Sequence, residues 1–233
     1  MDPLPDKSKI IDAAMRLASE RSWADVSMRD IAEEASVTLA DLRRVFGSKT
    51  QIVAAYIKRI DSDILGKVPQ REAGQSPRDA LFEILMARFD AMAPHKAALR
   101  SIDAATTLDT TLLGSLLNSQ RWMLMAAGLD GDGPRGTLRT TGLMTLFASV
   151  FRVWLQDDDP GLARTMAALD RRLRRAEASM SAIDQACDGA QRLGKSIIAG
   201  LTGLADRAAG KRRRSDADGS EGPRYDAAPD AAG

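Results

Sequence analysis

Apolar residues recur at the spacing of an α-helix through the N-terminal part of this chain, in short stretches that polar residues interrupt. The first stretch places its apolar side chains on one helical face: Ile10, Ile11, Ala14, Leu17 and Ala18. A second, short helix is expected after Ser27, because Ser27 can cap it and Asp30 stands at the third helical position of a capping box. Trp23 and Val26, between these two helices, are predicted to close a small core.

A tight turn and a third short helix are predicted directly afterwards. Residues 35–38 supply the turn, and Thr38 can cap a helix that buries Leu42. Arg43 and Arg44 then remain on its outer side. One face of this helix holds it to the domain while the other can meet a groove, which is the division expected of the recognition helix in a DNA-binding helix-turn-helix.

Ser48 is predicted to cap a fourth helix, which runs through Ile52, Tyr56 and Ile60 and leads towards the rest of the chain. Up to about this point the sequence resembles the TetR family of bacterial repressors. The family's motif stands here as Ile31-Ala32, Ala35-Ser36-Val37, Leu42-Arg43, Phe46 and Ser48-Lys49.

Two positions depart from the family's motif. Ser36 stands where a turn glycine is usual, so a serine must bear any positive φ that the turn imposes. Arg43 stands where an aromatic residue usually touches a phosphate. An arginine can contact either a phosphate or a guanine edge, so the departure changes the chemistry of the contact without removing it.

The motif and the resemblance together predict contacts with a double-stranded DNA operator. The residues expected to make them are Ser27, Arg29, Thr38, Leu39, Arg43, Arg44, Ser48 and Lys49. Thr38 and Arg43 are expected to reach bases or backbone, whereas Ser27, Ser48 and Lys49 lie at helix starts, where phosphate binding is favoured. The alternative for the two serines is a role as helix caps only.

Composition favours helices throughout. The chain has 233 residues, with abundant Ala, Leu, Met and Arg and only 4% aromatic residues, so we expect an all-α protein. The formal net charge is only +1, so attraction to DNA must come from local placement of basic side chains. The N-terminus lacks the apolar core of a signal peptide and no apolar run could span a bilayer, so a cytoplasmic location is expected.

Breaks in the helical pattern divide the chain. We expect a DNA-binding domain over 1–65, a linker over 66–77, a helical effector-binding and dimerisation domain over 78–182, an amphipathic helix over 183–210 and a polar tail over 211–233. Within the second domain the pattern predicts helices at about 78–92, 95–105, 109–128, 136–156 and 160–182. The resemblance implies an effector pocket in this domain and a homodimer interface made by its last two helices.

Apolar and sulfur-containing side chains in the second domain could line a cavity for a hydrophobic effector. They are Met86, Phe89, Trp122, Met123, Met125, Leu143, Met144, Phe147, Phe151 and Trp154. The alternative is that most of them are ordinary core and dimer residues at helical spacing. On the first interpretation, a hydrophobic small molecule would release a repressor from its operator.

A second resemblance gives the competing hypothesis. Residues 151–173 look like the corresponding part of the ubiquinone-biosynthesis lipid-binding proteins, which share the TetR fold, and this would imply an isoprenoid lipid carrier at a membrane surface. The apolar face of 183–210 and the basic residues 211–214 could pack on the dimer, attach shallowly to a membrane or add nonspecific DNA affinity. Arg43, Arg44 and Lys49 favour the DNA-binding regulator.

Catalysis has little support in the sequence. His95 follows Pro94 at an expected helix start, and Cys187 has no basic or metal-ligand pattern beside it and cannot form an internal disulfide. The acidic run before Pro160 is better explained as the cap of the next helix than as a cation site. No phosphate-binding glycine loop or Cys/His zinc pattern is present, so we expect no enzyme activity, cofactor or metal.

Overall fold

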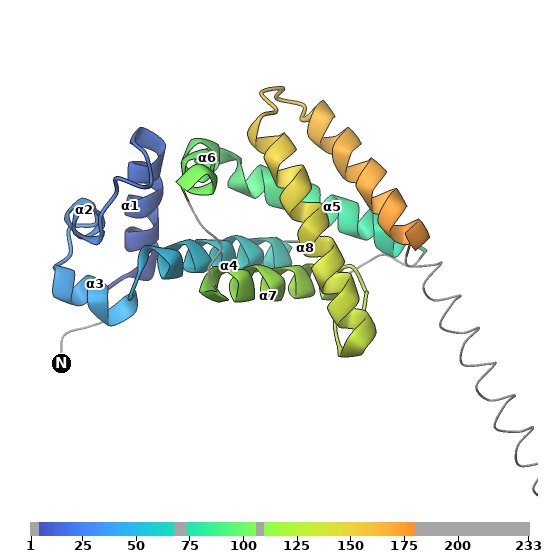
Figure 1. Cartoon of the computed structure of the whole chain (residues 1–233), viewed down its shortest axis with the longest axis horizontal. Coiled ribbons are helices and arrows are strands. Elements are labelled where there is room, and N and C mark those ends of the chain that lie inside the picture. The colour runs from blue at the N-terminus through green and yellow to red at the C-terminus, as the bar shows by residue number, and fades with distance from the viewer. Residues whose placement is uncertain (1–4, 68–73, 106–109, 180–233) are drawn as a thin grey trace, which may run out of the picture. The chain divides into compact units, whose positions relative to one another are not determined.

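The computed structural model describes residues 5–67, 74–105 and 110–179, and in these ranges all regular structure is helical. The helices are α1 Lys7–Glu20, α2 Met28–Glu34, α3 Leu39–Val45, α4 Lys49–Lys67, α5 Pro77–Met92, the 3-10 turn η1 Ala93–His95, α6 Lys96–Ala105, α7 Thr110–Ala126 and α8 Gly133–Leu155, followed by a helical segment over 163–179 (Figure 1). The predicted all-α class is confirmed.

The caps of the two short N-terminal helices lie where the sequence predicted them. Ser27 and Asp30 form a complete capping box at the start of α2, in which the Ser27 amide donates to the Asp30 carboxylate at 2.8 Å. The Thr38 hydroxyl accepts the Asp41 amide at 3.0 Å at the start of α3. These local hydrogen bonds satisfy amides that the first helical turn leaves unpaired.

The turn between α2 and α3 carries the strain expected of it. Ser36 has a φ of 54°, in the left-handed region that glycine adopts at lower cost. Val37 in this turn is half-buried against the core. Trp23, Val26 and Leu42 are buried as predicted, and they form the small core under the turn.

Helix α4 joins the N-terminal helices to the remaining ones without a break. Its buried side chains include Ile52 and Tyr56 near its start and Ile60 and Ile64 further along, and it packs against α1, α5 and α7. The described residues up to Glu177 form one compact unit. The expected boundary at residue 65 therefore falls inside a continuous helix, because this helix contributes to the packing on both sides.

The predicted acidic cap before the last described helix is confirmed. The Asp159 carboxylate accepts the amides of Gly161 and Ala163 at 3.1 Å each. Asp157 accepts both the amide and the hydroxyl of Thr165, at 2.8 Å and 2.7 Å. These hydrogen bonds lower the pKa of Asp157, the Thr165 hydroxyl contributing most.

Several sequence predictions lie outside the described residues. They concern the amphipathic helix over 183–210, the basic run over 211–214 and Cys187. In the part of the chain that the structure covers, no helix is long and apolar enough to cross a membrane. The same residues include no cluster of three or more His, Cys, Asp or Glu side chains that could hold a metal ion.

Candidate nucleic-acid interface

Helix α3 has one buried and one exposed side, as a recognition helix requires. Leu42 is 1% exposed and holds α3 to the core, whereas Leu39, Ala40 and Arg43 lie on the exposed side. Residues three and four apart in a helix share a face, so these three side chains form one continuous surface. An apolar half and a cationic half therefore stand side by side on the outer face of α3.

The Arg43 side chain lies over Gly47, at the end of the recognition helix. A Cβ atom added to Gly47 would approach Arg43 Nη1 to 3.1 Å, which is tighter than ordinary packing. The Gly47 amide also donates to Gln51 Oε1 at 2.6 Å. The glycine therefore leaves room for the Arg43 guanidinium close to the backbone, which was not predicted from the sequence.

The other polar residues of α3 interact with one another. Arg44 Nη1 lies 3.3 Å from Asp41 Oδ1, and the Thr38 hydroxyl donates to Asp41 Oδ2 at 2.7 Å. The hydrogen bond from Thr38 is the main cause of the lowered pKa of Asp41. Thr38 thus acts as a cap, and a DNA contact by Arg44 would compete with its ion pair to Asp41.

Lys49 has a structural role that the sequence did not reveal. Its ammonium donates to the backbone carbonyls of Trp23 and Val26 at 2.5 Å and 2.7 Å, and it lies 4.7 Å from the centre of the Trp23 ring. Burial lowers its pKa from the ordinary value, with Asp25 and Asp30 opposing the shift. The expected phosphate contact by Lys49 stays a prediction, but this side chain already ties the start of α4 to the loop before α2.

The remaining predicted DNA contacts lie on the same unit. Arg29 is exposed on α2, and the Ser27 hydroxyl accepts the Asp30 amide at 3.2 Å. Ser48 Oγ accepts the Gln51 amide at 3.3 Å, so both serines serve as caps. Arg21, absent from the predicted set, pairs with Asp30 at 2.9 Å.

The predicted ligand residues lie in different surroundings in the described structure. Phe89, Met123, Phe147 and Trp154 are buried in the core, where Phe89 stacks on Phe147 and on Trp154 with ring centres 5.3 Å and 5.5 Å apart. Leu143 is also buried; Met86, Met144 and Phe151 are half-buried; and Trp122 and Met125 are each 47% exposed. For the buried members, ordinary core packing describes what is seen.

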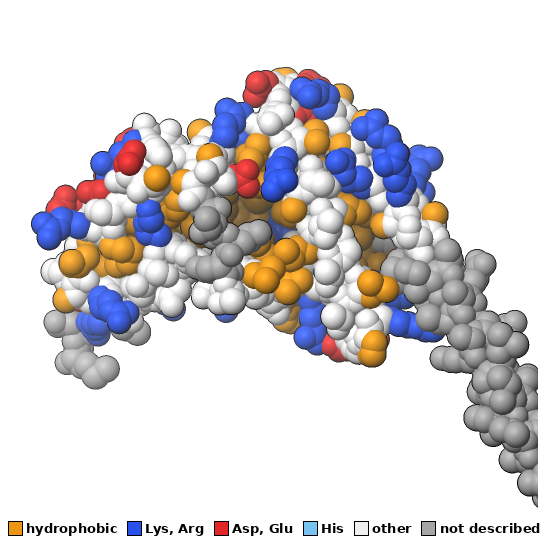
Figure 2. All heavy atoms as spheres, in the orientation of Figure 1, with side chains coloured by type: hydrophobic (Ala, Val, Ile, Leu, Met, Phe, Trp, Pro, Cys, Tyr) orange, Lys and Arg blue, Asp and Glu red, His pale blue; other side chains and the backbone are white. Residues whose placement is uncertain are grey.

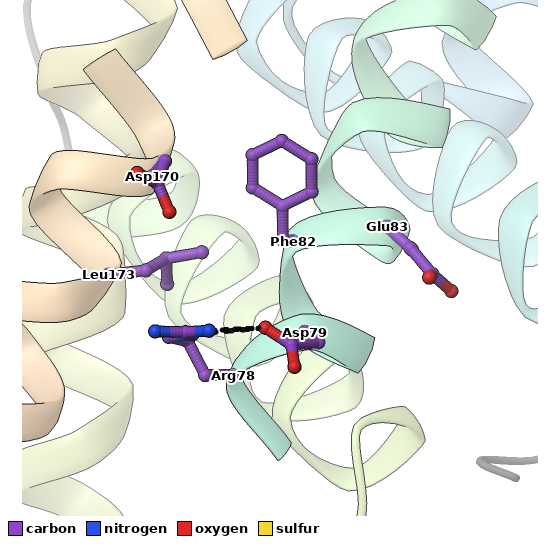
Figure 3. Close-up of a pocket in the computed structure, with 6 residues that line it drawn as sticks. All are labelled: Arg78, Asp79, Phe82, Glu83, Asp170 and Leu173. Atoms are coloured by element: carbon purple, nitrogen blue, oxygen red, sulfur yellow. Dashed lines mark hydrogen bonds and ion pairs between the residues drawn. The ribbon is translucent and has the colours of Figure 1, made fainter. Parts of the chain in front are cut away.

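Two hollows in the described surface lie away from most of these residues. A groove of about 530 Å³ runs between α4 and α7, and of the predicted ligand residues only Trp122 lines it. A smaller cavity of about 180 Å³ lies between α5 and the segment 163–179, where Arg78 donates to Asp79 and Leu173 stands across from them (Figure 3).

A buried polar network joins α4, α5 and α7, within the helices from α4 onward that are called the body below. This network was not predicted from the sequence. Arg88 Nη2 lies 3.1 Å from Asp61 Oδ1, and the Ser119 hydroxyl donates to the same oxygen at 3.0 Å. The Arg88 guanidinium also stacks 4.5 Å from the centre of the Phe147 ring. An arginine standing within the apolar stripe of α5, beside Leu85 and Phe89, was the available signal.

Some buried side-chain polar atoms of α5, α7 and α8 have no hydrogen-bond partner among the described residues. They are Arg88 Nε and Nη1, both amide atoms of Gln120, and Thr140 Oγ1. All three side chains are more than nine-tenths buried. Buried polar groups without partners are costly, so each of these atoms invites a ligand or an ordered water.

Comparison with known proteins shows what the N-terminal part of the chain is similar to. Residues 10–56 match the model of the TetR family of bacterial regulatory proteins. The HTH-type transcriptional regulator BetI of Rhizobium meliloti is 31% identical over 105 residues, which cover 42% of this chain and 49% of that protein. The Agrobacterium fabrum BetI is 33% identical over 90 residues, covering 38% and 43%. The chain thus spans about half the length of the curated relatives it matches.

Solved structures show the same fold. A TetR transcriptional regulator from Nitrosomonas europaea has a TM-score of 0.57 at 24% identity, covering 76% of this chain and 99% of that one. A TetR regulator from Rhodococcus sp. RHA1 has a TM-score of 0.55 at 24% identity, covering 72% and 92%. The helix-turn-helix and the match of residues 10–56 define the N-terminal part of the chain as a DNA-binding domain of the TetR type. The chain shares the fold of these TetR regulators over about three quarters of its length.

Proposed function

We propose that this protein is a homodimeric transcriptional regulator that represses genes by binding a palindromic or near-palindromic DNA operator. The observation that carries the proposal is the outer face of α3, where Leu39, Ala40 and Arg43 stand exposed on a helix that Leu42 anchors. In a helix-turn-helix this face enters the major groove. In a dimer, the two N-terminal units of helices α1–α3, called the heads below, are related by a twofold axis. They would meet half-sites about 34 Å apart, one helical turn of DNA.

The family resemblance supports dimerisation through α8 and the segment 163–179. Leu138 on α8 is 45% exposed and Met166 on the following segment is 38% exposed. Apolar side chains on these two helices suit a surface that a second copy covers. A lipid carrier acting at a membrane is not favoured, because the similar proteins found are transcriptional regulators.

Replacing Arg43 by alanine is expected to weaken binding to a selected operator about 10-fold, the range of one good arginine contact to a base edge. If Arg43 reads an edge, the variant also loses preference at one position of each half-site. A gel-shift titration against salt concentration measures both effects. Lys58→Ala, which removes an exposed cation from α4, away from α3 and from the proposed dimer interface, is the control. Unchanged affinity, base preference and salt slope in Arg43→Ala would remove Arg43 from the interface.

We also propose that an amphipathic small molecule binds inside the body and weakens DNA binding. The unpartnered atoms of Arg88, Gln120 and Thr140 support a ligand with hydrogen-bonding groups, and the Phe147 ring beside Arg88 supports one with an apolar part. Such an effector can act only if it binds two conformations of the protein with unequal affinity.

A direct path of hydrogen bonds supports communication between the body and the head. The Ser101 hydroxyl on α6 accepts the Trp23 amide at 2.8 Å and donates to the Arg21 carbonyl at 3.2 Å. The carbonyl of Trp23 in turn accepts the Lys49 ammonium at the start of α4. A shift of α6 would therefore reach the loop before α2 and the start of α4 together.

Native mass spectrometry of the protein isolated from its host is expected to find a bound small molecule. Gln120→Leu should lose that molecule without lowering the free energy of unfolding of the empty protein, because the substitution removes two unpaired buried atoms. Trp122→Ala, at an exposed position, is the control and should retain the molecule. A wild-type protein that carries no molecule, or a Gln120→Leu variant that still carries it, would count against an interior effector site.

A further inference from the structure

An apolar groove lies on the face of the head that carries the recognition helix. It has a volume of about 420 Å³ and lies between the start of α2 and α3, lined by Met28, Leu39, Ala40, Leu42, Arg43 and Gly47. Figure 2 shows hydrophobic side chains gathered over α2 and α3, with basic side chains around them. Of the residues that line it, Leu42 anchors α3 to the core, whereas Leu39, Ala40 and Arg43 are exposed.

Leu39 is the feature of this groove that the fold does not explain. It occupies the first position of α3, directly after the cap Thr38, and half of its side chain is exposed. Leu42, which anchors the helix, is by contrast 1% exposed. Contact between an exposed leucine side chain and water is unfavourable, so covering Leu39 with another apolar group lowers the free energy.

The cation beside the groove indicates what covers it. Arg43 stands four residues after Leu39 and three after Ala40, so the three side chains share one face. A partner must therefore present apolar groups and negative charge within about 5 Å of each other, one helical turn. In the major groove of DNA, the 5-methyl group of thymine is the apolar group on a base edge, and phosphates and guanine edges lie close to it.

We propose that Met28, Leu39 and Ala40 form a pocket that receives the 5-methyl group of a thymine in each operator half-site. The inference rests on the proposed DNA binding and adds a base to it. Leu39 supplies the exposed wall, Met28 the flexible one, and Arg43 contacts the phosphate or guanine next to that thymine. The operator is thus selected partly by a methyl group and partly by charge.

The test begins with duplexes selected from a random pool by the full-length protein. Each thymine of a selected site is then replaced by deoxyuridine, which lacks only the methyl group. We expect one thymine per half-site whose replacement weakens binding about fourfold, equivalent to exposing one buried methyl group. Replacing it in both half-sites should weaken binding about 15-fold, and other thymines should tolerate the change.

The Leu39→Ala variant identifies the side chain that reads the methyl group. Leu39 is half-exposed, so the variant should fold, and it should bind thymine and deoxyuridine sites with nearly equal affinity. Leu113→Ala, at a partly exposed leucine of α7, is the matched control and should keep the discrimination. Failure to select any site defeats the proposed DNA binding itself. A selected site that is indifferent to deoxyuridine, or discrimination that persists in Leu39→Ala, overturns the thymine pocket alone.

Discussion

Replacing Asp61 by alanine is expected to lower the free energy of unfolding by about 3–5 kcal/mol, because it leaves the Arg88 cation buried without a counter-charge. Arg88 is 1% exposed and Asp61 7%, so water cannot replace the lost carboxylate. Burial raises the pKa of Asp61 and lowers that of Arg88, and the attraction between the two charges opposes both shifts. Removing one member alone therefore leaves the other as a buried charge without a partner.

Chemical denaturation monitored by circular dichroism measures this loss. Asp63→Ala removes an exposed carboxylate two residues away on α4 and should change stability by less than about 0.5 kcal/mol. The double variant Asp61→Ala/Arg88→Met should recover much of the lost stability, since it removes both buried charges. If Asp61→Ala and the double variant lose the same free energy of unfolding, the loss does not come from leaving the Arg88 charge unpaired.

The second large effect is expected at Trp154. Its side chain is 0% exposed and stacks with Phe89 and Phe151, with the Lys96 ammonium 5.3 Å from its ring centre. Truncation to alanine leaves a cavity in a packed core, so Trp154→Ala should cost about 3–5 kcal/mol. Thermal and chemical unfolding measure it.

Trp122→Ala is the matched control for the Trp154 substitution. The Trp122 indole is 47% exposed beside the groove between α4 and α7, so its removal should change the free energy of unfolding by less than about 1 kcal/mol. The pair of variants separates a tryptophan of the core from one on the surface. If Trp154→Ala is as stable as Trp122→Ala, the Trp154 ring lies beside a cavity and not in a packed core. Trp154 would then be a candidate ligand contact again.

The N-terminal unit could be predicted from the sequence in some detail. The capping box of Ser27 and Asp30, the Thr38 cap and the positive φ of Ser36 were all expected, and all are present. Each depends on groups within about four residues of one another, so the local sequence specifies it. The exposed position of Arg43 follows from the same periodicity, since Leu42 must face the core.

Other features needed contacts that periodicity cannot show. Lys49 has the same place in the motif whether it meets phosphate or protein, and only the folded loop brings the Trp23 and Val26 carbonyls to its ammonium. The pair of Arg88 with Asp61 joins α5 to α4 across 27 positions of sequence (88 − 61).

The aromatic residues of the body illustrate the same limit. Helical spacing places Phe89, Phe147 and Trp154 on inward faces but does not say whether an inward face meets other side chains or a cavity. Packing of α5 against α8 fills the space between these rings, so they belong to the core. Local hydrogen bonds and periodicity thus specified the helices and their caps, whereas contacts between distant helices decided which side chains are core, which are paired and which remain exposed to a partner.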